Sequence, residues 1–376
     1  MSEGLDHISG PTSGRRNLLA QWMGLVTVTA VVVVGLTHVR APAALLVGPL
    51  LAGVVFALGG ASIRPAKAVK FCAQAVIGTA VAIVLAPALG AQMIPRIVLL
   101  VFIGTTTLGV GMGLAFLSGQ MGLMSPSTAV WGLAPGSATA MMVFAEAAGG
   151  DARKVALMQY ARIVLVAFAT LAVAHGMTHA AIGQAARNWL PELSPIGLSA
   201  TIALGGGAVL LSLWTRVGVL ALLVPILGGM LLGAAGVPFQ TPPLMTAAAY
   251  AVIGWTIGLS FTRASLVDNL YSLPVIGGGA IVLIGACAFV GLVLGRLFHV
   301  DPLSAYLATS PGGIDAMLII AASAPVDLPL ILSAQLVRFL MVLAFARPIG
   351  SLLVRRARLV PGVPLTAATE HLRDSR

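Results

Sequence analysis

Long apolar runs alternate with short polar connections along most of this chain. In the first half the runs lie near residues 18–37, 43–60, 67–89, 96–118 and 152–174, and a comparable series follows in the second half. Each run is close to the roughly 20 residues that a helix needs to cross the hydrocarbon core of a bilayer. The pattern predicts an all-α polytopic membrane protein.

Composition and charge support this fold class and exclude others. Hydrophobic residues make up 59% of the 376 residues and charged residues only 9%, against roughly 25% in soluble domains. The mean hydropathy is +1.03. The formal charge of +10 comes from Lys and Arg scattered between apolar runs, which indicates the lipid bilayer as partner and excludes a nucleic-acid-binding patch.

The chain resembles itself at a fixed shift of 176 residues. Matching pairs include Arg40 with Arg216, Pro135-Gly136 with Pro311-Gly312, Gln159 with Gln335, and Arg162 with Arg338. Matched polar residues and prolines at one constant shift predict a duplicated unit of about 155 residues. We expect the following organisation: an N-terminal tail at 1–17, a first membrane repeat at 18–180, a linker at 181–195, a second membrane repeat at 196–354 and a basic tail at 355–376.

One apolar segment in each half is interrupted by a Pro-Gly pair. The segments cover residues 125–148 and 301–324, and the pairs lie near their middles. Proline removes a helical hydrogen-bond donor and glycine weakens a helix, so each segment should break there. Each is expected to be either a re-entrant hairpin or a discontinuous span, which leaves about five spanning helices per repeat.

The distribution of Lys and Arg favours hairpins. With hairpins the two repeats are inverted, and 12 loop cations face the cytoplasm against 4 outside; with crossing segments the split is 10 to 6. Because cytoplasmic loops are enriched in Lys and Arg, the charge pattern favours inverted repeats with both termini in the cytoplasm.

The interrupted segments and the spans that follow them are the candidate binding site. Broken helices in corresponding positions of two halves are typical of transporter sites, and a half-helix N-terminus suits an anionic ligand. Arg162 and Arg338 lie within spans, where a charge needs a buried partner, so they either bind a substrate anion or act as structural clamps. The candidate substrate-binding residues are Pro135, Gly136, Ser137, Thr139, Gln159, Arg162, Ser310, Pro311, Gly312, Gly313, Gln335 and Arg338.

Two carboxylates in these segments are candidates for ion coupling. Asp315 corresponds to the neutral Thr139, and Glu146 lies nearer the end of its segment. A buried carboxylate can carry a proton or bind Na⁺. No metal or other cofactor is expected, because neither Cys72 nor Cys287 belongs to a metal-binding motif and no catalytic constellation is visible.

Two regions carry a resemblance to the AbrB membrane protein family. They are Ala134-Pro135-Gly136-Ser137 with the following Gln159-Tyr160-Ala161-Arg162, and Ser310-Pro311-Gly312-Gly313-Ile314-Asp315-Ala316-Met317 with Gln335-Leu336-Val337-Arg338. The resemblance implies a duplicated protein of the bacterial inner membrane. The family also carries an ammonia monooxygenase label, which fits poorly with the lack of a metal-ligand cluster, and its members are associated with control of gene expression.

Together these features predict a secondary transporter of a small, anionic metabolite, coupled to H⁺ or Na⁺, with its site between the two breaks. The alternative is a membrane sensor that influences gene expression indirectly. We expect no enzymatic activity, and the sequence leaves open whether the chain forms a homo-oligomer.

Overall fold

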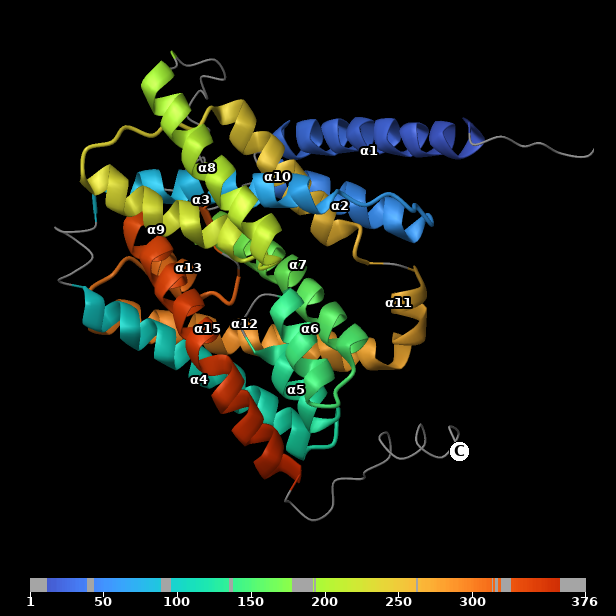
Figure 1. Cartoon of the computed structure of the whole chain (residues 1–376). Helices are drawn as coiled ribbons and strands as arrows, with labels where there is room; N and C mark the ends of the chain where they lie inside the picture. Colours follow the sequence, from blue (N-terminus) through green and yellow to red (C-terminus); the bar gives the residue numbers. More distant parts are fainter. Residues whose placement is uncertain are drawn as a thin grey trace, which may run out of the picture.

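The computed structural model describes residues 12–38, 44–88, 96–134, 138–177, 192, 194–261, 263–312, 314, 317–318 and 326–358. Within these ranges the regular structure is helical and contains no strand (Figure 1). The helices of the first half are α1 (Thr12–His38), α2 (Ala44–Leu58), α3 (Lys67–Leu85), α4 (Ile97–Gln120), α5 (Pro126–Leu133), α6 (Ala138–Ala147) and α7 (Ala152–Met177). Those of the second half are α8 (Pro195–Thr215), α9 (Leu220–Ala234), α10 (Pro243–Gly258), α11 (Arg263–Asp268), the 3₁₀ turn η2 (Leu270–Ser272), α12 (Leu273–Leu297), α13 (Pro302–Thr309) and α15 (Leu328–Arg358).

Six of the described helices are long and apolar enough to cross a membrane, as a multi-pass membrane protein requires. They comprise α1, α3, α4, α8, a stretch that includes α12, and the first part of α15. By contrast α2, α9 and α10 have only 15 or 16 residues, or about 22–24 Å at the helical rise. The predicted runs at 43–60 and 219–236 are therefore shorter as helices than as apolar sequence.

The helices also continue beyond the apolar runs at both ends of the chain. Helix α1 begins at Thr12, within the expected tail 1–17, and α15 continues to Arg358, within the expected tail 355–376. Polar residues can extend a helix past its apolar part, so the end of a span and the end of its helix need not coincide.

Four short helices cross in two reciprocal pairs. Helix α2 packs on α10, and α3 packs on α9. A Cβ placed on Gly254 would lie 2.8 Å from the Leu46 carbonyl oxygen, and one on Gly78 would lie 2.6 Å from the Leu222 carbonyl oxygen. These two contacts are related by the shift of 176 residues with the helices exchanged. Small residues at both crossings let the backbones approach closely, as in membrane helix pairs.

Both interrupted segments break at the Pro-Gly pairs. Helix α5 ends at Leu133 and α6 begins at Ala138, while α13 ends at Thr309. Each first half-helix starts with a capped proline turn, because the Ser125 hydroxyl accepts from the backbone N–H of Thr128 and the Asp301 carboxylate accepts from that of Ser304.

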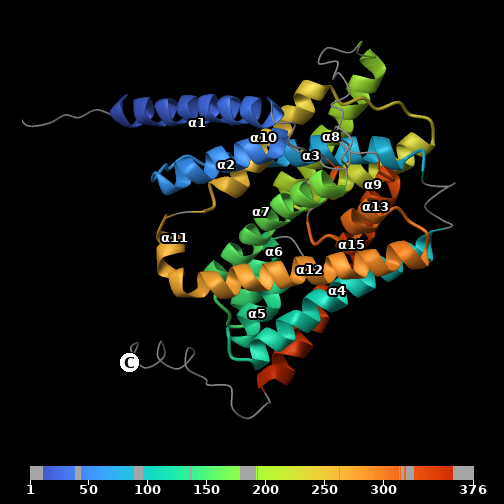
Figure 2. The ribbon, with the colours of Figure 1, turned by 180° about the vertical axis from the view of Figure 1, so that it is seen from behind.

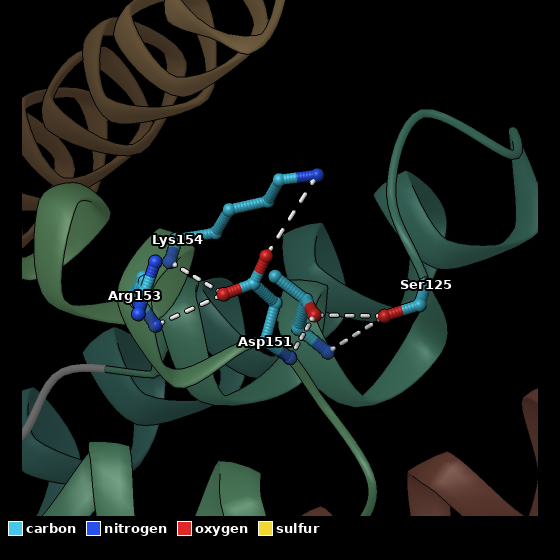
Figure 3. Close-up of polar contacts among 5 residues, drawn as sticks. Ser125, Asp151, Arg153 and Lys154 are labelled. Carbon is cyan, nitrogen blue, oxygen red and sulfur yellow. Dashed lines mark hydrogen bonds and ion pairs between the residues drawn. The ribbon is translucent and has the colours of Figure 1, made fainter. Parts of the chain in front are cut away.

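Each interrupted segment returns to the level at which it started. In the first, the backbone N–H of Asp151 donates to Thr128 Oγ1 at 3.0 Å, and the Asp151 carboxylate accepts from the N–H groups of Arg153 and Lys154 (Figure 3). In the second, the N–H of Asp327 donates to the Ser304 hydroxyl at 2.9 Å. The start and the end of each segment are therefore in contact, so both segments are re-entrant hairpins. We call residues 125–151 hairpin 1 and residues 301–327 hairpin 2.

The two hairpins start from opposite ends of α4. At the C-terminal end of this helix, a Cβ on Gly119 would lie 3.3 Å from Pro126 at the start of hairpin 1. At the N-terminal end, Arg96 Nη1 lies 2.5 Å from Asp327 Oδ2 at the end of hairpin 2. A helix of 24 residues is about 36 Å long. Figures 1 and 2 accordingly show α5 and α13 toward opposite ends of the helical body.

Candidate functional site

The polar residues of α7 and α15 lie buried against the two hairpins. Gln159 and Gln335 are fully buried, and Arg162 and Arg338 are each only 5% exposed. Helix α7 packs on α5 and α6, and α15 packs on α13. Residues three apart share a helical face, so each Gln and Arg act on the same part of a hairpin.

The Gln side chains replace hydrogen bonds that the prolines cannot make. In a helix the N–H of residue 135 would bond to the Trp131 carbonyl, but Pro135 has no N–H. Instead Gln159 Nε2 donates to the carbonyl oxygens of Trp131 at 2.9 Å, Ala134 at 3.0 Å and Gly132 at 3.3 Å. The amide thus satisfies the carbonyls freed at the break of hairpin 1.

The same substitution occurs in hairpin 2. Pro311 cannot donate to the Leu307 carbonyl, and Gln335 Nε2 donates to it at 2.9 Å and to the Ser310 carbonyl at 3.2 Å. The sequence separation between Gln and the first carbonyl is 28 residues in both hairpins. The Pro-Gly breaks and the Gln residues therefore form one structural unit in each half.

The Arg side chains hold the same hairpin tips. Arg162 Nη1 donates to the Ala134 carbonyl at 2.9 Å, and Arg338 Nη1 donates to the equivalent Ser310 carbonyl at 2.5 Å. Arg338 Nη2 also donates to the Gly312 carbonyl at 2.5 Å and to Gln335 Oε1. Cations at the C-terminal ends of α5 and α13 also interact favourably with the helix dipoles. These contacts are those of a clamp on loop carbonyls.

Both guanidinium groups approach one central region. Arg162 lies close enough to Arg338 and to Cys287 of α12 for electrostatic interaction, and Arg338 also lies near Cys287. The clamps of the two halves therefore meet, and a buried region with two guanidinium groups suits a negatively charged ligand.

Several predicted site residues fall outside this description. Pro135, Gly136, Ser137, Gly313 and Asp315 lie outside the described residues, and only the backbone of Thr139 is described, in α6. Ser310, Pro311 and Gly312 are buried at the tip of hairpin 2. The structure thus brings Gln159, Arg162, Gln335 and Arg338 together with the hairpin tips.

The described carboxylates lie away from the clamps. Glu146 is exposed near the end of α6. Ion pairs between described residues join Arg96 with Asp327 at 2.5 Å and Lys154 with Asp151 at 3.9 Å, both near the hairpin starts and ends. Within the described part of the chain, no group of three His, Cys, Asp or Glu side chains could hold a metal ion.

A cavity of about 710 Å³ opens where hairpin 2 starts and ends. Its polar lining includes Arg96, His299, Asp301, Ser304 and Asp327. His299 has a positive φ of 53°, in the turn that joins α12 to hairpin 2. The cavity gives hairpin 2 an aqueous approach at the end that faces Arg96.

Sequence reasoning missed three hydroxyl residues near the centre. Tyr306 and Ser310 belong to hairpin 2 and Thr170 belongs to α7; of these only Ser310 was a candidate, and its hydroxyl had no assigned role. Tyr306 lies in an apolar stretch and Thr170 in an apolar helix, so neither stands out in the sequence. The available signal was that their counterparts at the 176-residue shift, Val130 and Ala346, are apolar.

Comparison with known proteins identifies the family. Residues 45–354 match the family described as transition state regulatory protein AbrB. The chain is 33% identical over 351 residues to a protein of Escherichia coli (strain K12) named "Putative regulator AbrB", covering 90% of this chain and 99% of that protein. No solved structure matches the chain. The chain is a membrane-type member of the AbrB family.

Proposed function

We propose that the protein is a secondary transporter of a small anionic metabolite, with its binding site where the tips of the two hairpins meet. The observation that carries the proposal is the pair of re-entrant hairpins that start from opposite ends of α4 and are held by buried Gln and Arg clamps. Irregular backbone at membrane depth occurs where it is buried in protein or lines a polar cavity, and such breaks form the sites of many transporters.

The two halves form an inverted repeat in this proposal. The crossed helix pairs, the clamps and the hairpin contacts all recur at the 176-residue shift. A Cβ on Gly218, in the turn after α8, would lie 2.9 Å from Phe71 at the start of α3, so these two connections share one side. That side is the one the inverted arrangement assigns to both connections, and parallel repeats would separate them.

The positive-inside rule places both termini in the cytoplasm of a bacterium, with the protein in the inner membrane. Hairpin 1 then enters from the cytoplasmic side and hairpin 2 from the outer side. Transport is coupled to H⁺ or Na⁺, for which Asp315 is the first candidate and the exposed Glu146 the second. The proposal includes no enzymatic step and no cofactor, and it leaves the oligomeric state open.

Flux measurements in proteoliposomes test the proposal. Purified protein should take up labelled small organic acids when an inward H⁺ or Na⁺ gradient is imposed, and an ionophore that collapses the gradient should stop the uptake. If protein that retains its helical circular dichroism spectrum moves no organic acid under either gradient, the transporter proposal is wrong.

The second candidate is a membrane sensor, which the name of the Escherichia coli relative favours. A sensor needs a cytoplasmic surface for its partner, and the basic C-terminal tail is the candidate. Because α15 continues to Arg358, deleting residues 359–376 leaves the described helix intact. A sensor should lose its effect on gene expression after this deletion, whereas a transporter should keep its flux.

A further inference from the structure

The polar groups at the centre divide into a symmetric set and an asymmetric set. Gln159 and Arg162 have identical counterparts 176 residues later, and all four side chains donate to carbonyls of the hairpin tips. The asymmetric set is Thr170, Cys287, Tyr306 and Ser310, whose counterparts are Ala346, Gly111, Val130 and Ala134. All four counterparts lack a polar side chain, so the clamp does not need the asymmetric groups.

The asymmetric groups gather at hairpin 2. The Tyr306 hydroxyl lies near the hydroxyls of Thr170 and Ser310, and Cys287 lies near Tyr306 and Arg338. Thr170 and Ser310 are fully buried, Tyr306 is 3% exposed and Cys287 is 1% exposed. One small region therefore combines three hydroxyls, a thiol and a guanidinium group.

The three hydroxyls have unused hydrogen-bonding capacity. The oxygens of Thr170, Tyr306 and Ser310 are buried, and none has a hydrogen-bond partner. A buried polar group without a partner costs free energy, and such groups in native proteins call for an explanation. Three of them side by side, on the half that departs from its counterpart, indicate a ligand that supplies the missing partners.

Arg338 supplies the charge for such a ligand. Its contacts with described residues are two carbonyl oxygens and the Gln335 amide oxygen. These use three of the five N–H donors of a guanidinium group and neutralise none of its charge. A ligand carboxylate can therefore bind Arg338 without breaking the clamp.

We propose that the hydroxyls of Thr170, Tyr306 and Ser310 form a subsite for the uncharged polar end of a small hydroxycarboxylate whose carboxylate binds Arg338. A hydroxyl group both donates and accepts hydrogen bonds, so a ligand hydroxyl matches this cluster better than an apolar group does. The buried position restricts the ligand to a small molecule. The inference names the substrate class of the proposed transporter and rests on that proposal for its biological role, but binding can be measured without transport.

Thermal melting of the purified full chain in detergent tests the inference, with sodium L-lactate as the probe. A ligand that binds the folded state raises the melting temperature as its concentration increases, which yields an apparent Kd. Sodium acetate and sodium propionate lack the hydroxyl and should bind about tenfold more weakly than lactate, as expected for one lost hydrogen bond.

Tyr306→Phe and Ser310→Ala each remove one hydroxyl and keep the packing. Both should weaken lactate binding about tenfold without lowering the melting temperature of the unliganded protein, because the hydroxyls have no protein partner to lose. Ser212→Ala in α8 is the matched control, since Ser212 is also fully buried with an unpartnered hydroxyl but belongs to another part of the fold. Its lactate affinity should equal that of the unmodified protein.

Three outcomes would overturn the inference: equal binding of lactate and acetate, unchanged lactate affinity in Tyr306→Phe and Ser310→Ala, or stabilisation by sodium chloride alone that these substitutions abolish, which would indicate a cation site. Absence of lactate binding would do the same. The proposed transport function fails only if no solute flux is found, so the two failures are distinguishable.

Discussion

Gln335 offers the sharpest test of how the hairpin breaks are stabilised. Substitution by Met keeps the length and nearly the volume of the side chain but removes the amide, so changes in packing should be small. The Leu307 carbonyl then loses the donor that replaces the missing N–H of Pro311. The Ser310 carbonyl keeps its bond from Arg338, so one buried acceptor is left without a partner.

The expected cost follows from that count. A buried carbonyl without a partner costs about 1–3 kcal/mol, so Gln335→Met should lower the free energy of unfolding by this amount. Gln120→Met, at the exposed end of α4, is the control and should change it by less than about 0.5 kcal/mol. Reversible unfolding in mixed detergent micelles, followed by circular dichroism, measures both.

A double-mutant cycle identifies the cause. Pro311→Ala supplies an N–H four residues after Leu307, which can donate to the same carbonyl. Gln335→Met should therefore cost about 1 kcal/mol or more less in the Pro311→Ala background than in the unmodified chain. Equal costs in the two backgrounds would refute the explanation that the Gln amide replaces the proline N–H.

Three further predictions concern packing, topology and the ends of the hairpins. Gly258→Ala places a Cβ 2.2 Å from the Leu50 carbonyl oxygen and should destabilise the protein by about 1–3 kcal/mol, whereas Gly277→Ala, which meets nothing within 4 Å, should stabilise it by up to about 1 kcal/mol; thermal melting would contradict this if both substitutions had the same effect. Single cysteines at residues 152 and 326, in a chain without native cysteines, should be labelled from the cytoplasm and from outside respectively, and labelling from the same side would contradict the inverted repeat. Asp327→Ala removes the carboxylate that accepts from the Leu330 N–H and should cost about 1 kcal/mol in unfolding measurements; a neutral result would show that this cap is unimportant.

Local signals in the sequence account for much of the fold. The apolar runs predict the helices to within a few residues in most cases, because lipid requires each span to satisfy its own backbone hydrogen bonds. Pro135-Gly136 and Pro311-Gly312 predict the breaks, since proline cannot donate. Asp151 and Asp327 were expected to act as helix N-terminal charges, and their contacts with the first turns of α7 and α15 confirm this role.

Contacts between distant parts of the chain could not be predicted in the same way. Arg96 and Asp327 are 231 residues apart, and nothing local to either residue names the other. The charge count favoured hairpins only by a margin, whereas the return of each segment depends on single contacts such as Asp151 with Thr128. For the Arg residues, the alternatives of ligand contact and clamp required the positions of the carbonyls at the hairpin tips. The geometry shows the clamp contacts, and the ligand role stays a proposal.

The native thiol of Cys287 allows the most direct test of the central claim, that the buried centre opens in turn to both sides of the membrane. Replacing the exposed Cys72 by Ser leaves Cys287 as the single cysteine. In proteoliposomes a membrane-impermeant maleimide can be added outside or enclosed inside. The account predicts slow modification of Cys287 from either side, because each hairpin covers the centre from one end of α4. Modification from one side only, or from neither side in folded protein, would contradict alternating access.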